Sequence, residues 1–377
     1  MIYLDHSATT KVLPQAAEAA CAVMRETFGN PSSLHGLGVA AERTLENARE
    51  SIARTLQAQP QEIVFTSGAT EADNLAVFGA VKALRRRGKR IVTTAVEHPA
   101  VAECCARLAE EGFEVVALRP ENGRIRPEQV FDAVTPDTVL VSMMAVNNET
   151  GDRLPLDAVA PAIRRAGAPA LFHCDGVQAF GKQELVPGRL GIDLLALSAH
   201  KLYGPKGVGA LYIRRGARIL PQLAGGGQER GLRSGTENLP GIAGFAAAVE
   251  YVYPRRAEID KHIKALRARL LARVAGMDEI VLNSPPDGAP HIVNLSVLGC
   301  RSEIALHFLE ERGIYVSSGS ACSSKGKKRA RVLEAYGLPP ERYDTALRIS
   351  FGMENDEREI DALADGLQAC VARFVKR

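Results

Sequence analysis

Lys201 and Asp175 are the two residues of this chain that best suit covalent chemistry. Each follows directly on an apolar segment of strand-like composition, so both side chains are expected to be rigidly held and partly removed from water. A lysine in that position can carry a Schiff base, and an aspartate can pair with the nitrogen of a pyridine ring. Pyridoxal phosphate requires this combination. A buried Lys–Asp ion pair between neighbouring strands is the alternative, but the nearby Gln178, Ser198 and His200 favour a cofactor site.

Segment 66–71 (TSGATE) has the composition of an anion-binding turn. It joins an expected strand to an expected helix, so backbone N–H groups at the helix start can bind a phosphate, and its glycine permits close approach. The segment therefore suits a phosphate, with Ala69 and Thr70 at the helix start. Ordinary N-capping of the helix by Ser67 or Thr70 is the alternative.

Three further polar residues suit substrate handling. His98, in the sequence EHP, is placed to stack on the cofactor ring and to move protons. Asn148 lies in a turn and can hydrogen-bond a ring oxygen or a substrate carboxylate. Arg348 is a charge within the apolar segment 347–351, where a bidentate clamp on an α-carboxylate accounts for it. A solvated loop histidine, a simple turn and a structural ion pair are the respective alternatives.

Cys322 has the surroundings of a reactive thiol. It lies in segment 317–324 (SSGSACSS), whose small polar residues offer a cysteine nothing to pack against. The basic segment Lys325–Arg331 follows it and favours the thiolate, which is the nucleophilic form. We therefore predict a nucleophilic cysteine on a loop that swings between the cofactor and a partner. An incidental loop cysteine is the alternative.

The elements that must position these residues follow an α/β pattern. Apolar strands alternate with amphipathic helices between residues 60 and 215, which favours a mostly parallel sheet with helices on both faces. Ligand sites in such sheets gather at the carboxyl ends of the strands. Five polar residues lie just past such ends: Thr70, His98, Asn148, Asp175 and Lys201. The expected strands are 63–66, 91–95, 115–118, 139–143, 170–173, 194–198 and 208–213.

The second half of the chain does not continue this regular alternation of strands and helices. A long helical pattern runs from Pro240 towards Ala275 and is expected to bend near Pro254. We predict a large cofactor-binding domain of residues 14–254, and a smaller α+β domain of residues 1–13 and 255–377 that carries the cysteine loop. The elements expected in the smaller domain are strands at 280–282, 292–296, 314–317 and 347–351 and helices at 302–312 and 356–375.

The composition indicates which broad class of protein this chain belongs to. The chain has 377 residues, 46% of them hydrophobic and 24% charged, which is typical of a globular protein with a large core. Its net charge of +3 is too small to indicate direct nucleic-acid binding. We expect a cytoplasmic protein, because the chain has no apolar run long enough for a membrane span and no secretory signal. Its seven cysteines lack paired spacing, which argues against a disulfide framework and a metal site.

The chain resembles the cysteine desulfurases of the NifS/IscS type, within the class V aminotransferase-like pyridoxal-phosphate enzymes. The match covers nearly the whole chain in the family's order, and the form GSACSS is that of the branch with the longer, mobile cysteine loop. The matching segments are YLDHSATT at 3–10, GNPSS at 29–33, TSGATE at 66–71, EHP at 97–99, NNETG at 147–151, DGVQ at 175–178, SAHKLYGPKGVG at 198–209, RSGTEN at 233–238, SSGSACSS at 317–324 and LRISFG at 347–352.

The resemblance implies a fold type I enzyme that binds pyridoxal 5′-phosphate and forms a homodimer with active sites at the subunit interface. Lys201 is expected to hold the cofactor through a Schiff base, with Asp175 at its ring nitrogen and His98 stacked on its ring. The other implied cofactor contacts are Gln178 at the ring hydroxyl, Thr70, Ser198 and His200 at the phosphate, and Thr236 at the phosphate of the neighbouring subunit's site.

The reaction that the resemblance implies is that of an L-cysteine desulfurase. Asn148 and Arg348 orient L-cysteine, Lys201 or His98 moves its Cα proton, and Cys322 takes the sulfur as a persulfide while L-alanine leaves. The implied sulfur acceptors are a scaffold protein for iron–sulfur clusters or a tRNA-thiolation enzyme. The rival interpretations are another enzyme of the class, such as a selenocysteine lyase or an aminotransferase, and a catalytically silent assembly platform.

Overall fold

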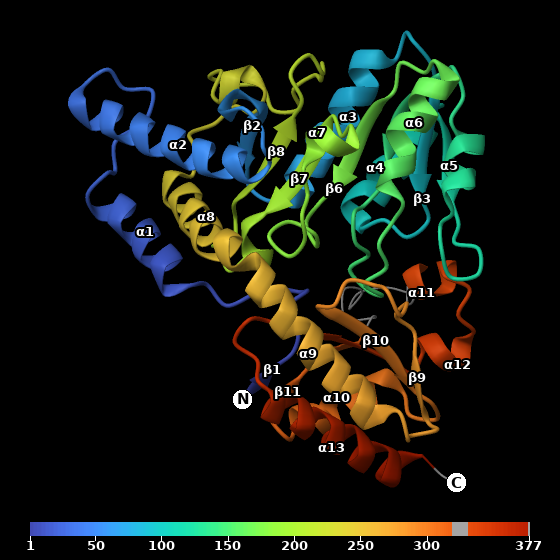
Figure 1. The fold of residues 1–377 in the computed structure, drawn as a ribbon. Helices are drawn as coiled ribbons and strands as arrows, with labels where there is room; N and C mark the ends of the chain where they lie inside the picture. The colour runs from blue at the N-terminus through green and yellow to red at the C-terminus, as the bar shows by residue number, and fades with distance from the viewer. Residues whose placement is uncertain (319–330, 376–377) are drawn as a thin grey trace.

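A seven-stranded sheet forms the centre of the protein. The computed structural model describes residues 1–318 and 331–375. The strands are β2 (Ile63–Thr66), β3 (Arg90–Thr94), β4 (Glu114–Leu118), β5 (Thr138–Ser142), β6 (Leu171–Asp175), β7 (Leu194–Ser198) and β8 (Gly209–Ile213), in the spatial order β2-β8-β7-β6-β5-β3-β4 (Figure 1). The run from β4 through β3, β5 and β6 to β7 is parallel, whereas β8 is antiparallel to both of its neighbours.

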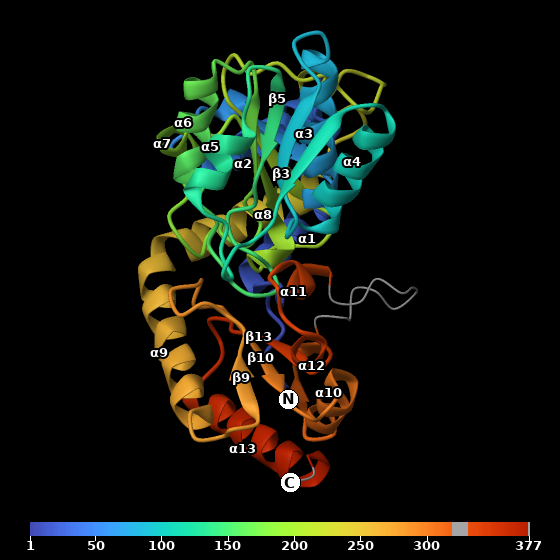
Figure 2. The ribbon, with the colours of Figure 1, turned by 90° about the vertical axis from the view of Figure 1, so that its right-hand side faces the viewer.

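Helices cover both faces of this sheet. The strands β5, β6 and β7 are buried along their whole length, as apolar strands between two helical layers must be. Figure 2 shows α4 on one side of the sheet and α5 and α6 on the other. The helices of this region are α1 (Pro14–Arg25), α2 (Gly36–Thr55), α3 (Ala69–Leu84), α4 (Pro99–Glu110), α5 (Pro127–Ala133), α6 (Leu156–Ala166), α7 (Pro187–Leu190) and α8 (Leu239–Val252). The predicted fold class, a mostly parallel sheet covered by helices, is confirmed.

Strand β6 determines which way its polar side chains face. Leu171 packs in the cluster formed with α3 and α4, whereas Phe172 and Cys174 pack in the cluster on the opposite face. Successive side chains of a strand alternate between the two faces. His173 and Asp175 therefore lie on the face that α3 covers, and Asp175, expected just past the strand, is its last residue.

A second sheet of four antiparallel strands lies below the first in Figure 1. Its hydrophobic cluster is built by helices α9, α10 and α13 against the strands. Its spatial order is β12-β13-β10-β9. The elements are α9 (Arg256–Val274), β9 (Ile280–Leu282), β10 (Ile292–Val297), α10 (Ser302–Glu310), β12 (Ser317–Ser318), α11 (Arg331–Ala335), α12 (Pro340–Tyr343), β13 (Ala346–Ser350) and α13 (Glu357–Phe374).

The prediction of one strand at 314–317 is wrong in one respect, because the structure has two short strands there. Its first part, β11 (Ile314–Tyr315), pairs in parallel with β1 (Ile2–Tyr3), whereas β12 belongs to the four-stranded sheet. The N-terminal strand β1 thus pairs with β11, and the chain passes from this two-stranded sheet to the four-stranded sheet at Val316.

The long helical pattern after Pro240 is two helices. α8 ends at Val252, a 3₁₀ turn spans Tyr253–Arg255, and α9 starts at Arg256, so the bend lies at the expected proline. α8 runs beside the large sheet and α9 beside the small one (Figure 1). The predicted domain boundary at residue 254 lies in this turn and stays a prediction. Within residues 1–318 and 331–375, no helix has the length and apolar character that a membrane span needs.

Candidate active site

One cavity brings together most of the predicted site residues. It has a volume of about 650 Å³. Thr236 is exposed and does not line it, and Cys322 lies outside the described residues. The predicted residues that line it are Ala69, Thr70, His98, Asn148, Asp175, Gln178, Ser198, His200, Lys201 and Arg348.

Lys201 is held by the N-terminal segment of the chain. It ends a 3₁₀ turn that follows β7 directly. Its Nζ donates hydrogen bonds to the backbone oxygens of Ser7 at 2.6 Å and Ala8 at 2.7 Å. The same carbonyl of Ser7 accepts from the Gln178 side chain at 2.9 Å. Residues 7–9, which sequence reasoning did not assign to the site, therefore form one wall of it.

Asp175 and His98 lie close enough in this cavity to affect each other's pKa. The Asp175 carboxylate accepts from the Val177 N–H at 3.0 Å, and burial raises its pKa while His98 and Lys201 oppose that rise. His98 caps α4, because its Nδ1 accepts from the Ala100 N–H at 3.1 Å. Burial also lowers the pKa of His98. A neutral His98 with an occupied Nδ1 lone pair carries its proton on Nε2.

A buried polar cluster lies behind Asp175. His173 Nε2 is 3.3 Å from an Asp73 carboxylate oxygen, and His173 Nδ1 is 2.8 Å from the Ser142 hydroxyl. Burial raises the pKa of Asp73 well above its ordinary value and lowers that of His173 to about 3. Burial also raises the pKa of Glu97 to about 8. Sequence reasoning missed Asp73, although its place on the buried side of the expected helix, beside Ala72, was a usable signal.

The phosphate end of the cavity is the start of α3. This helix begins after Gly68 without a side-chain cap, so its first N–H groups are available to a ligand. Gly209 of β8 permits the close approach of this turn, because a Cβ there would lie 2.8 Å from the Gly68 Cα. His200 bonds the Thr9 hydroxyl at 3.1 Å, and burial lowers its pKa to about 4, which keeps it neutral.

Arg348 occupies the opposite end of the cavity and is held by two carboxylates. One terminal nitrogen lies 2.9 Å from Glu149 Oε1, and the other lies 3.0 Å from Asp5 Oδ1. The Asn148 side chain donates to the same Glu149 oxygen at 3.2 Å. The ion pair considered as an alternative for Arg348 therefore exists, and both of its acidic partners come from segments that match the family.

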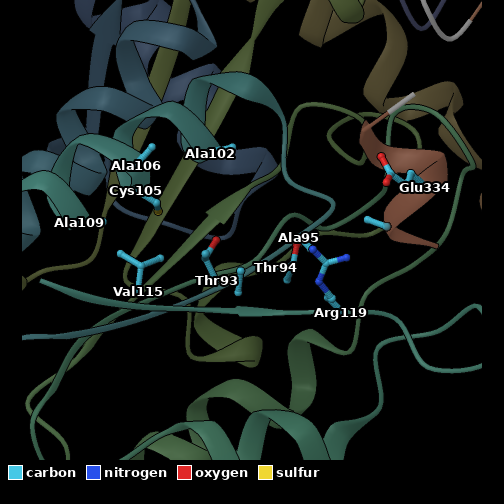
Figure 3. Close-up of a pocket in the computed structure, with 12 residues that line it drawn as sticks. Thr93, Thr94, Ala95, Ala102, Cys105, Ala106, Ala109, Val115, Arg119 and Glu334 are labelled. Atoms are coloured by element: carbon cyan, nitrogen blue, oxygen red, sulfur yellow. The ribbon is translucent and has the colours of Figure 1, made fainter. Parts of the chain in front are cut away.

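A second cavity, of about 280 Å³, lies at the edge of the large sheet between α4, β4 and α11. Figure 3 shows Cys105, Ala102 and Ala106 of α4 on one side and Thr93 and Val115 of the strands on the other. Burial raises the pKa of the Cys105 thiol to about 12, so it is no nucleophile at neutral pH. No predicted site residue among those that the structure describes lines this cavity.

Comparisons with known proteins agree with this geometry. Residues 2–363 match the family model Aminotransferase class-V. A cysteine desulfurase IscS of Pseudomonas aeruginosa (strain UCBPP-PA14) is 42% identical over 380 residues, covering 99% of this chain and 93% of that protein. A solved NifS-like protein has a TM-score of 0.93 at 36% identity, covering 98% of this chain and 99% of its own. SspA in complex with cysteine has a TM-score of 0.82 at 34% identity, with coverage of 93% and 99%. The chain belongs to the aminotransferase class-V family.

Proposed function

We propose that this protein is an L-cysteine desulfurase that uses pyridoxal phosphate and passes sulfur through a persulfide on Cys322. The observation that carries the proposal is the single cavity in which Lys201, Asp175, His98 and Arg348 meet. Relatives support it, because the IscS protein of Pseudomonas aeruginosa is named a cysteine desulfurase and SspA was solved with cysteine.

The residues present fit pyridoxal phosphate. The uncapped start of α3 suits its phosphate, the buried Asp175 carboxylate suits its ring nitrogen, and Lys201 Nζ supplies the amine. When bound, the cofactor takes up the electron pair released at the substrate Cα. Ala69, Thr70, Ser198 and His200 would hold the phosphate, and Gln178 would meet the ring hydroxyl.

Proton transfer falls to Lys201 rather than His98 in this arrangement. His98 accepts a backbone N–H at Nδ1, so its Nε2 carries the proton and can donate but not accept. Lys201 Nζ, once released from the Ser7 and Ala8 carbonyls, has a lone pair to take the Cα proton. With the cofactor bound, His98 would stack on the ring and donate from Nε2.

Substrate orientation and sulfur transfer belong to the Arg348 end. Arg348 and Asn148 would bind the α-carboxylate of L-cysteine and so orient the substrate in the cavity. The segment with Cys322 begins next to this end, because Ser317 of β12 pairs directly with Arg348 of β13. Cys322 attacks the cysteine sulfur, and the products are L-alanine and the Cys322 persulfide.

The working form is a homodimer. Several large apolar side chains are exposed at the corner between α1 and α2, among them Phe28 at 65% and Leu34 at 99%. This corner projects away from the large sheet (Figure 1), and an exposed apolar patch favours a partner surface. Thr236, which lies outside its own cavity, contributes to the neighbouring subunit's phosphate site.

The persulfide sulfur passes to an acceptor protein. We expect an iron–sulfur scaffold or a tRNA-thiolation enzyme, and the first is favoured by the IscS name of the relatives. Acceptor identity is tested by following labelled sulfur from cysteine to each purified candidate.

The experiment that tests the activity measures alanine release from L-cysteine by the purified holoenzyme, with mass spectrometry of the Cys322 peptide. We expect alanine and a sulfur adduct of +32 Da on Cys322, and loss of the adduct in Cys322→Ser. Transamination of a keto acid without alanine release from cysteine contradicts the proposal.

A further inference from the structure

Arg348 already holds two carboxylates before any substrate arrives. Its side chain is 4% exposed, and its ion-pair partners Glu149 and Asp5 are 9% and 20% exposed. The three residues come from β13, from the segment after β5 and from the N-terminal segment. They are therefore fixed by three separate parts of the fold.

A third anion at this end competes with the two carboxylates that Arg348 already binds. Glu149 and Asp5 together carry two negative charges, which the positive charges of Arg348 and Lys201 balance. The carboxylate of L-cysteine adds another negative charge, and buried charges need partners or must become neutral. One terminal nitrogen of the guanidinium donates to Glu149 and to the Asn148 carbonyl, and the other donates to Asp5, so a bidentate carboxylate competes with these acceptors for Arg348.

Glu149 is the carboxylate best placed to be displaced from Arg348 by a substrate carboxylate. Its Oε1 accepts from both Arg348 and the Asn148 side chain, which are the two residues assigned to the substrate carboxylate. Its Oε2 has no hydrogen-bond partner among the residues that the structure describes. Glu149 thus already makes the contacts that a bound carboxylate requires.

The electrostatic surroundings of Glu149 agree with this role. The charged groups that face it are Arg348, Asp5 and Lys201, and burial raises its pKa despite the two cations. Asp5 faces Arg348, Lys201 and the Tyr3 hydroxyl, and burial raises its pKa as well. Loss of the Arg348 contact leaves Glu149 buried without its nearest cation, which favours its protonated form.

We propose that Glu149 is an internal placeholder for the substrate: the carboxylate of L-cysteine replaces the Glu149 carboxylate at Arg348 and Asn148, and Glu149 takes up one proton from solvent as its ion pair breaks. Glu149 is a positioning residue that sets substrate affinity and couples it to pH. The proposal rests on the proposed function of Arg348 as the carboxylate clamp.

The test uses 3-mercaptopropionate, which is cysteine without its amino group and therefore cannot form a Schiff base. Its binding to the holoenzyme is measured by calorimetry at pH 7 to 8.5 in HEPES and in Tris, whose different ionisation enthalpies report proton uptake. We expect uptake of about one proton per bound molecule in the wild-type protein. The visible absorbance of the cofactor, recorded in the same titration, corrects for protons that it takes up itself.

Glu149→Gln keeps the shape of the side chain and removes the competing charge. We expect it to bind 3-mercaptopropionate about tenfold more tightly than wild type and to abolish the proton uptake. Glu114→Gln, which removes a surface partner of Arg90, is the matched control and leaves both values unchanged. Asp5→Asn is expected to retain the proton uptake.

The outcomes separate the inference from the proposed function. Weaker binding in Glu149→Gln, or proton uptake that disappears in Asp5→Asn instead, overturns the placeholder role. Wild-type binding without proton uptake overturns it as well, and this measurement needs no variant. Arg348→Gln tests the clamp separately: unchanged affinity for 3-mercaptopropionate contradicts the function proposed for Arg348.

Discussion

The two ends of the active-site cavity handle charge in opposite ways. At the cofactor end, the carboxyl groups of Asp73, Glu97 and Asp175 are buried, and their pKa values are raised chiefly by that burial. At the substrate end, Arg348 is paired with Glu149 and Asp5 at 2.9 and 3.0 Å. Burial acts on the carboxyl groups of both ends, but at the substrate end Arg348 opposes its effect directly, and we propose that one of those carboxylates is displaced by the substrate.

The largest effect is expected from removing the amine at the cofactor end. Lys201→Ala should lower alanine formation from L-cysteine by on the order of 10⁴-fold, because both the cofactor attachment and the proton acceptor are lost. Steady-state alanine release at saturating cysteine measures it. Lys82→Ala, a lysine of α3 outside this cavity, serves as the control, and a Lys201→Ala protein with near-normal turnover contradicts the account.

At the substrate end, Arg348→Gln should raise KM for L-cysteine by about 100-fold and change kcat less. It should also lower the free energy of unfolding by about 3 kcal/mol, because the buried Glu149 and the part-buried Asp5 lose their cation. Kinetics and urea unfolding test the two effects. The double variant Arg348→Gln/Glu149→Gln should regain part of the stability but not the KM, and full stability in the single variant argues against the ion pairs.

The acidic character of the cofactor end predicts a pH dependence of stability. Glu97 has a pKa of about 8 in the folded protein, above its ordinary value near 4.5, so the folded state binds more protons than the unfolded state between these values. Its contribution is present at low pH and is lost as pH rises through 8. The unfolding free energy of wild type should therefore fall between pH 6 and pH 8. In Glu97→Gln this fall should be smaller by about 2 kcal/mol. Parallel pH curves for the two proteins rule this out.

The smallest effect is expected outside the active-site cavity. Cys105→Ala changes a buried thiol in the alanine-lined cavity of Figure 3 and should leave kcat and KM for L-cysteine within about twofold of wild type. A larger loss of turnover would assign that cavity a part in the reaction.

The cofactor end could largely be predicted from the sequence, and the substrate end could not. Lys201, Asp175, His98 and Thr70 each lie at or just past the end of a short apolar strand, and the carboxyl ends of parallel strands meet at one edge of a sheet. The fold type and the desulfurase activity expected from the sequence agree with the comparisons. The roles of the individual residues stay predictions.

The partners of Arg348 could not be predicted because they are distant in sequence. Glu149 and Asp5 are separated from it by 199 and 343 residues, and no local pattern links such positions. Helix α1 was missed for another reason: only Ala16 and Val23 of it are buried, and most of its apolar residues are alanines. The reversed direction of β8 leaves no trace in its composition either.

The central claim is that one lysine, Lys201, bonds the cofactor. Borohydride reduction of the holoenzyme fixes the cofactor to the amine that holds it, and peptide mapping by mass spectrometry then locates the label. We predict a single labelled peptide with the modification on Lys201. A label on another lysine, or none after loading with pyridoxal phosphate, contradicts the account.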